Sequence, residues 1–295
     1  MFRIVGFILM SLIVFGGYMA LGGNPLNILK PVDLIVIFGG GALGMVIACE
    51  MSQLRLMAKQ IKQAFQSTQY TQEYYIQLLR LSYELVNVAR TKNTKELDKH
   101  VESPAESAIF SKYELITKDE DVKNFIVDGY RYVIGVQADA KKAGQVQQHL
   151  DEEISELADQ YDTPSNKMTM MADSLPALGI LMAILSLTIV MSNLDQDILV
   201  IGQLIGSALV GTLTGVLGAY CFALPLAKAM GAVATSQIQP LMCVRSTLLE
   251  FTRGGSAHLC ANAARKHIPI DIKPSFDELE QDVAVLQDIY SASND

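Results

Sequence analysis

The chain has 295 residues, of which 50% are hydrophobic and 18% charged, and its mean hydropathy is +0.27. This composition excludes a purely soluble protein and indicates that part of the apolar material faces lipid. The net charge of −8 argues against nucleic acid as a partner.

Four stretches carry no charged side chain: Ile4–Gly22, Leu34–Cys49, Ser174–Leu194 and Ile198–Ala227. Because a helix rises about 1.5 Å per residue, roughly 20 apolar residues cross the hydrocarbon core of a bilayer. The second stretch is short, and Val32 and the stretch Met51–Leu56 can extend it. The sequence therefore predicts four transmembrane helices, paired two and two around a long polar segment.

Flanking charges predict the orientation of these spans. The short connections 23–33 and 193–197 contain Lys30 as their one cation, whereas the other side holds Arg3, Arg55, Lys59, Lys62, Lys167, Lys228 and Arg245. Cytoplasmic loops carry an excess of Lys and Arg. We therefore expect a multi-pass protein with both termini and the large polar segment in the cytoplasm.

Apolar periodicity in the polar segment is helical throughout. One stripe consists of Leu54, Ala58, Ile61 and Phe65, and a second of Tyr74, Leu78, Leu81, Leu85 and Val88. A third stripe, which follows Thr117 and Glu120, consists of Val122, Phe125, Ile126, Tyr130 and Val133. No strand or hairpin pattern occurs, so the predicted fold is all-α.

Capping motifs predict where the polar helices begin. Ser103 with Glu106, Thr117 with Glu120, and Ser275 with Glu278 each have the spacing of a capping box. Thr163-Pro164 predicts the start of a helix that runs into the third span. We expect transmembrane helices 1 and 2 in 1–50 and a helical cytoplasmic domain in 51–169. Helices 3 and 4 follow in 170–230, and cytoplasmic C-terminal helices with an acidic tail in 231–295.

Small residues crowd the second and fourth spans. Gly40 and Gly44, and then Gly202, Gly206, Gly211 and Gly215, repeat the G-x-x-x-G spacing that lets helix backbones approach closely in lipid. Packing within the chain and contacts between subunits explain this spacing equally well.

The spans contain no Asp, Glu, Lys, Arg or His, although such side chains within a membrane usually mark an ion or proton path. Only hydroxyls are present there, among them Thr188, Ser207, Thr212 and Thr214. We expect Thr188 and Thr214 to bond back to their own helix, which leaves Thr212, beside two glycines, as the candidate functional hydroxyl. If an ion crosses, another protein must supply the carboxylate.

Two prolines stand at matching cytoplasmic ends of the third and fourth spans. Pro176 and Pro225 each remove a backbone hydrogen bond and can kink a helix. We expect them to form a hinge layer, with Asp173 as the one acid at that boundary.

Chemical motifs are few. Arg90, Lys92 and Lys95, alternating with Glu96, Asp98 and Glu102, form a mixed-charge surface, which is usually only a solvated face. The nucleotide-binding, zinc-protease and serine-hydrolase motifs are missing. The four cysteines form no C-x-x-C pair and fit no common zinc spacing. We expect no enzymatic activity, no metal and no cofactor.

Several short motifs resemble the MotA family of flagellar motor stator subunits. They are Phe15-Gly16-Gly17-Tyr18, Gly22-Gly23, Phe125-Ile126-Val127-Asp128, Asp151-Glu152-Glu153-Ile154, Asp173-Ser174-Leu175-Pro176-Ala177, Val210-Gly211-Thr212, Pro225-Leu226-Ala227 and Pro274-Ser275-Phe276. They occur in order over nearly the whole chain and together are specific.

The resemblance implies an inner-membrane ion channel that converts ion flow into torque. Five such chains surround two copies of a single-span MotB-like partner, whose aspartate carries the ion. Arg90 and Asp98 match positions that contact the rotor protein FliG, although Asp98 is often glutamate in the family. Pro176 and Pro225 match prolines linked to ion-driven movement, and Thr212 matches a threonine on the inner wall.

The resemblance also bears on the coupling ion. Ala183 stands seven residues after Pro176. At the position that it resembles, sodium-driven members of the family have a threonine. A methyl group offers no ligand to Na⁺, so we expect protons to be the coupling ion. The alternatives are a proton-driven energiser of the ExbB or TolQ type, which typically has three spans, and a non-conducting membrane scaffold.

Overall fold

The computed structural model describes residues 2–28, 30–137, 139–192, 197–281 and 284, and every regular element among them is helical. The chain divides into two compact units, which we describe separately. The first combines residues 1–67 and 160–234, and the second combines residues 68–159 and 235–295. Two long helices, α9 (Ala143–Met191) and α11 (Leu224–Thr252), contribute residues to both.

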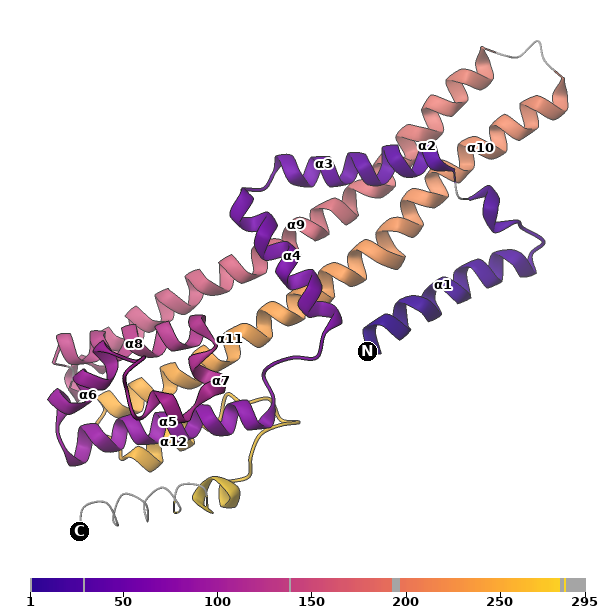
Figure 1. Ribbon diagram of the computed structural model, residues 1–295. Coiled ribbons are helices and arrows are strands. Elements are labelled where there is room, and N and C mark those ends of the chain that lie inside the picture. The colour runs from indigo at the N-terminus through magenta and orange to yellow at the C-terminus, as the bar shows by residue number, and fades with distance from the viewer. Residues whose placement is uncertain (1, 29, 138, 193–196, 282–283, 285–295) are drawn as a thin grey trace. The chain divides into compact units, whose positions relative to one another are not determined.

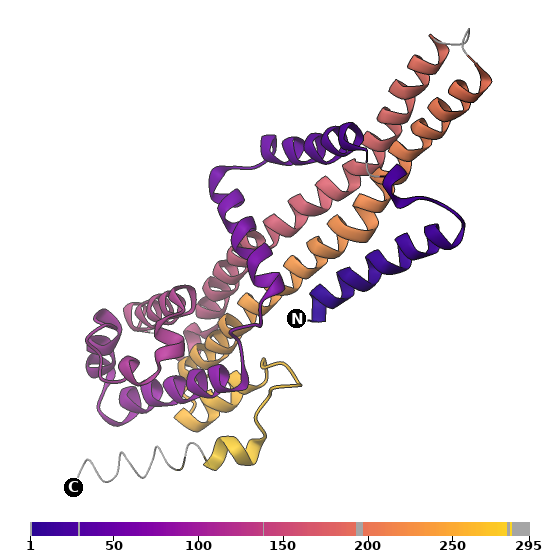
Figure 2. The same cartoon turned by 45° about the vertical axis from the view of Figure 1, so that its right-hand side comes forward.

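The first unit contains the apolar helices. They are α1 (Phe2–Ala20), α2 (Pro31–Leu34), α3 (Gly40–Ile47), α4 (Met51–Phe65), the second half of α9 and α10 (Ile198–Leu217), with a short 3₁₀ turn at Pro25–Asn27. Figure 1 shows the second half of α9 beside α10, with α1 alongside, and the turned view in Figure 2 agrees.

Three helical stretches among the described residues are long and apolar enough to cross a membrane: Phe2–Ala20, Ala140–Met191 and Ile198–Thr252. The predicted second span lies in a shorter apolar helix, Pro31–Ile47. Residues 193 and 194, at the predicted end of the third span, fall outside the described residues, as does most of the connection 193–197.

Two π-helical segments interrupt the apolar helices. The segment η2 (Ile35–Gly39) joins α2 to α3, and η5 (Gly218–Ala223) joins α10 to α11. Pro225 follows η5 by two residues. Because proline has no N–H and its ring clashes with the carbonyl four residues earlier, the wider π turn accommodates it without breaking the helix.

The second unit has a conventional apolar core. Its elements are α5 (Gln72–Thr91), α6 (Thr94–Glu102), η3 (Phe110–Lys112), α7 (Glu114–Thr117), α8 (Glu120–Gly135), η4 (Ala140–Lys142) and α12 (Ala257–Arg265), with parts of α9 and α11. Both predicted stripes here are confirmed as buried: Tyr74, Leu78, Leu81, Leu85 and Val88 on α5, and Val122, Phe125, Ile126, Tyr130 and Val133 on α8.

The predicted stripe on α4 is partly wrong. Leu54, Ile61 and Phe65 are half-buried, but Ala58 is exposed. The buried positions of α4 are Met57, Gln60 and Ala64 instead. Met57 packs with Met168, Ala227 and Met230, so long-range neighbours select a face one residue away from the predicted one.

The predicted helix after Ser103 does not form. Residues 103–109 are turns, because the Ser107 hydroxyl accepts hydrogen bonds from the amides of Ile109 and Phe110 at 3.2 and 3.3 Å. Both of these apolar side chains are buried. Burying them and satisfying their amides at Ser107 outweighs the local signal for a helix start.

Two other predicted helix starts are displaced. The cap of α8 is Asp119, whose carboxylate accepts from the Val122 amide, whereas the Thr117 hydroxyl bonds back to Tyr113 and Glu114. The prediction of a start at Thr163-Pro164 is wrong, since Pro164 lies inside α9, which begins at Ala143; the predicted run into the third span is confirmed.

The final capping box is confirmed in full. The Ser275 amide donates to Glu278 Oε2 at 2.7 Å, and the Glu278 amide donates to Ser275 Oγ at 3.1 Å. A helix follows over 276–281.

Candidate functional site

Helices α9 and α10 meet through glycine backbones. A Cβ built on Gly215 would lie 2.5 Å from the Leu175 carbonyl oxygen, and one on Gly179 would lie 2.8 Å from the Gly211 carbonyl oxygen. No side chain fits at such separations. Gly179 was not predicted, although a lone glycine in an apolar span opposite a G-x-x-x-G run is the signal that could have identified it.

The six predicted glycines divide into two groups. Gly211 and Gly215 pack against α9, and Gly40 lies against Leu178, whose Cδ1 would be 3.4 Å from an added Cβ. Gly44, Gly202 and Gly206 have room for a Cβ with nothing within 4 Å. Packing within the chain thus accounts for the first group, while the second presents open helix surface.

Thr212 and Ala183 both lie at the contact between α9 and α10. The Thr212 Cα would lie 3.2 Å from a Cβ built on Gly179. The Ala183 amide nitrogen would lie 3.6 Å from a Cβ built on Gly211. Both residues are half-buried. The structure therefore places at one helix contact two residues that lie far apart in the sequence.

The remaining hydroxyls behave differently from one another. Thr188 Oγ1 donates to the Leu185 carbonyl at 2.6 Å, as predicted. The same prediction is wrong for Thr214, whose buried Oγ1 has no hydrogen-bond partner among the described residues. Ser207 Oγ accepts a hydrogen bond from Lys30 Nζ, a contact that the sequence did not indicate.

Leu175, just before Pro176, is fully buried in a glycine-lined niche. Its Cδ2 would be 2.8 Å from a Cβ on Gly41, and its Cδ1 3.4 Å from one on Gly218. The Phe38 ring of η2 also covers Gly218, at 2.5 Å from that Cβ position. The two π-helical segments therefore meet beside the proline of α9.

Acidic side chains occur at both ends of this region. Asp173 is exposed and forms no ion pair with the described residues. Because α2 begins at Pro31, Asp33 lies inside the helix of the second span, where it is 8% exposed. The predicted span begins one residue later, at Leu34, and therefore leaves Asp33 out.

Arg90 is held by its own chain at the end of α11. Its Nη2 donates to the carbonyls of Phe251 at 2.7 Å and Gly255 at 3.2 Å, and its guanidinium lies 4.8 Å from the Phe251 ring centroid. A cation that binds the last carbonyls of a helix stabilises that end. Arg90 therefore has a structural role that its charge pattern did not reveal.

Asp98 on α6 is half-buried, and its neighbours form ion pairs. Lys99 binds Glu96 at 2.8 Å and lowers the pKa of that carboxyl, while Arg131 binds Glu102 at 2.8 Å. A polar cleft of about 680 Å³ next to Arg90 is also lined by Lys95, Asp139 and Arg253. No group of three or more potential metal ligands occurs among the described residues.

Comparison with protein families gives two matches along the chain. The sequence model described as motility protein A N-terminal matches residues 4–93, and that of the MotA/TolQ/ExbB proton channel family matches residues 118–241. Chemotaxis protein LafT of Vibrio parahaemolyticus is 33% identical over 95% of this chain and 97% of its own length. Motility protein A of Salmonella typhimurium is 31% identical over 97% of this chain and 96% of its own length.

Two solved structures share the fold. The C. jejuni MotAB structure aligns with a TM-score of 0.70 at 16% identity, covering 91% of this chain and 95% of that one. The flagellar MotAB stator complex from Bacillus subtilis gives a TM-score of 0.65 at 18% identity, covering 92% and 98%.

Proposed function

We propose, because this chain belongs to the MotA family, that it is a stator subunit of the bacterial flagellar motor. The observation that carries the proposal is the similarity to LafT and motility protein A over almost the full length of each chain. The chain is an inner-membrane protein of a proton channel family, and its role is to convert ion flow into torque without enzymatic chemistry of its own.

The partner is a single-span MotB-like protein that carries the ion on a carboxylate. Both solved structures that share the fold are of MotAB, which supports such a partner. The absence of acids from the interior of the predicted spans supports it too, since an ion path needs an acceptor that this chain lacks there. Gly44, Gly202 and Gly206, which are open in the single chain, fit contacts between five copies around two partners.

The topology that we propose has four transmembrane helices, with both termini and the segment 51–169 in the cytoplasm. The second of these is the helix Pro31–Ile47, whose 17 residues are slightly shorter than a bilayer core requires. Cysteines introduced at Asn27 and Gln196 should react with an impermeant maleimide in intact cells. Reaction at Ser67 instead would contradict the orientation.

Protons are the proposed coupling ion. Ala183 adds no side-chain oxygen to the contact between α9 and α10, to which α10 contributes Thr212. One hydroxyl can hydrogen-bond a partner's carboxylate, but it is a poor substitute for the hydration shell of Na⁺. Swimming should therefore persist in sodium-free medium and stop with a protonophore; speed that follows external Na⁺ would contradict this.

The rotor surface that we propose includes Arg90 and Asp98, with FliG as the partner. Because Arg90 also binds the end of α11, its loss would impair swimming even without a rotor contact. Asp98→Lys tests the surface with less structural disturbance. Charge reversal on the rotor protein should partly restore swimming in this variant, whereas a purely structural defect would not respond.

The deciding experiment is complementation of a strain that lacks the stator gene. The chain, expressed with its partner, should restore swimming, and Pro176→Ala or Thr212→Ala should reduce it at unchanged protein level. Restoration of iron–siderophore uptake in a strain lacking its energiser would favour the ExbB-type alternative. The match of residues 4–93 to the motility protein A model weighs against that alternative.

A further inference from the structure

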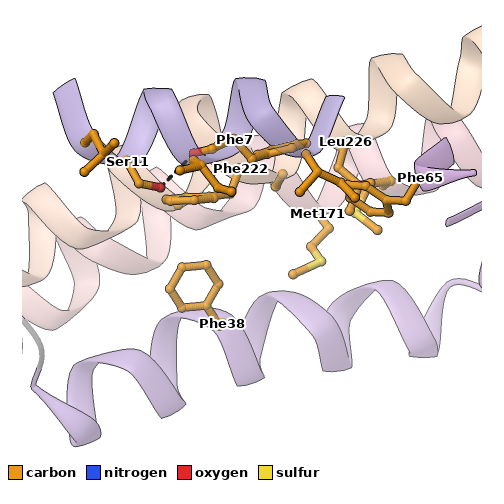
Figure 3. Close-up of a pocket in the computed structure, with 13 residues that line it drawn as sticks. Phe7, Ser11, Phe38, Phe65, Met171, Phe222 and Leu226 are labelled. Carbon is orange, nitrogen blue, oxygen red and sulfur yellow. Dashed lines mark hydrogen bonds between the residues drawn. The ribbon is translucent and has the colours of Figure 1, made fainter. Parts of the chain in front are cut away.

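An apolar cavity of about 630 Å³ opens between the helices of the first unit. Its lining comes from α1, α4, α9, both π-helical segments and the start of α11: Ile4, Phe7, Ile8, Ser11, Leu12, Phe38, Phe65, Met168, Met171, Gly218, Phe222, Ala223 and Leu226. Figure 3 shows Phe38 facing the cavity from one side, with Phe7 and Phe222 on the other. The volume is within the range of about 300–1,000 Å³ typical of ligand pockets.

The lining excludes a polar ligand. Ser11 is the one residue with a polar side chain, and its Oγ already donates to the Phe7 carbonyl at 2.9 Å (Figure 3). Burying a polar group without a hydrogen-bond partner is costly, so the occupant must be apolar where it lies inside.

A positive charge marks one end of this cavity. Arg3 precedes the lining residue Ile4, and its Nη1 donates to the carbonyls of Ala64 at 2.8 Å and Ala229 at 3.5 Å. Lys62 lies two residues before Ala64, Lys228 lies directly before Ala229, and both lysines are exposed. None of the three cations forms an ion pair with a described residue, so their charges remain available to an external anion.

We propose that this cavity binds one acyl chain of an anionic glycerophospholipid, with the lipid phosphate at Arg3. Arginine offers several N–H donors to a phosphate, and an anionic headgroup complements the neighbouring lysines. The proposal rests on the membrane placement given above. The acyl chain would touch Phe38 and Phe222, one from each π-helical segment, and so would contact the region that precedes Pro225.

The chain contains no tryptophan, so a single introduced one reports on this site. Phe222→Trp puts the reporter in the lining, and Tyr220→Trp puts a matched reporter in the same segment, where Tyr220 is 59% exposed and outside the lining. Phosphatidylglycerol with brominated acyl chains is then titrated into the full chain, purified in detergent with a partner variant in which every tryptophan is replaced by phenylalanine. Quenching should saturate at stoichiometric lipid for Phe222→Trp and rise in proportion to lipid for Tyr220→Trp.

Two further variants test the two ends of the lipid. Arg3→Gln should raise the half-saturating lipid concentration about fivefold, the effect expected of one basic residue near an anionic lipid, whereas Arg55→Gln should not change it. Ser11→Phe should place a bulky ring in the cavity and weaken saturable quenching, while Ile13→Phe, at a position 72% exposed and outside the lining, should keep it.

Identical quenching curves for the two reporters would overturn the proposal, as would a curve that Ser11→Phe leaves unchanged. Swimming is not part of this titration. A chain that bound the lipid but failed to power a motor would therefore disprove the proposed function and leave the lipid site intact.

Discussion

The two compact units bury their apolar side chains to very different degrees. In the second unit, one continuous core extends through α5, α8, α12 and parts of α9 and α11. The described residues of the first unit form two small clusters, α1 has no buried residue, and Leu12, Ile13 and Ile184 are more than half exposed. The second unit is therefore stabilised by the removal of its apolar side chains from water. The first unit needs an apolar surrounding, supplied by lipid or by neighbouring chains.

Polar groups show the same contrast. In the second unit, the fully buried Glu84 accepts hydrogen bonds from Lys112 and Tyr113, as a buried carboxylate requires. In the first unit, the backbones of Gly179, Gly211 and Gly215 are in direct contact. Close backbone packing replaces hydrophobic burial there as the main attraction between helices.

The largest expected effect is on the core of the second unit. Leu85→Ala should lower the free energy of unfolding by about 4 kcal/mol, because it removes a fully buried side chain and leaves a cavity. Ile184→Ala, at a position 54% exposed, should cost less than about 0.5 kcal/mol. Thermal unfolding followed by circular dichroism measures both, and equal losses would remove the contrast between the units.

A somewhat smaller effect is expected at the buried carboxylate. Lys112→Met should destabilise the protein by about 3 kcal/mol, because it leaves the Glu84 charge buried without this cation, whose Nζ lies 2.9 Å away. Glu84→Gln should cost only about 1 kcal/mol, since the Lys112 side chain is 48% exposed and can be hydrated. The reverse order in unfolding measurements would contradict this account.

Next in size is the glycine contact of the first unit. Gly215→Ala should destabilise the chain by about 2 kcal/mol, because the new Cβ would clash with the Leu175 carbonyl. Gly202→Ala has free space and should stabilise the isolated helix by up to about 1 kcal/mol. If Gly202 lies against another subunit, the added methyl group should nevertheless hinder assembly. Less of this variant should then co-purify with an affinity-tagged partner.

The smallest effect is on the pH dependence of stability in the second unit. Burial raises the pKa of the Asp119 carboxyl above its usual 3.8, so the folded state binds more protons than the unfolded state just above that pH. Stability should therefore fall as pH rises from 3.8 through the folded pKa, and Asp119→Asn should remove this slope.

Asp151 serves as the control of opposite sign. Its hydrogen bonds to Arg245 lower the pKa of its carboxyl, so its stabilising contribution is present above 3.8 and is lost as pH falls through the folded pKa. Asp151→Asn should remove that loss and leave the slope due to Asp119. Unfolding midpoints between pH 3 and pH 7 distinguish the two variants, and changes of the same sign would show the assignment to be wrong.

Periodicity predicted the buried face where one helix carries a single stripe. On α5 the residues from Tyr74 to Val88 recur at helical spacing, and all five predicted positions are buried. On α4 the predicted stripe included Ala58, whereas the neighbouring apolar residue Met57 is the one that is buried. Contacts with Met168 and Met230, far away in the sequence, decided between them.

Capping motifs were reliable only where no stronger partner competed. Ser275 and Glu278 exchange both hydrogen bonds of a capping box. The identical spacing at Ser103 and Glu106 gives turns, because burial of Ile109 and Phe110 sets the backbone path there. Local hydrogen bonds of about 1 kcal/mol are overridden by the burial of two large side chains.

The sequence by itself determined the all-helical character, the charge-free stretches, the missing mid-span carboxylate and the family, because each depends on composition or on local spacing. The tertiary structure decided the contacts of Gly179 with α10, of Lys30 with Ser207 and of Arg90 with Phe251. The last two pairs are 177 and 161 positions apart along the chain. No local pattern encodes such pairs, since each exists only after packing of distant helices has brought a donor to a carbonyl or hydroxyl that its own helix leaves free.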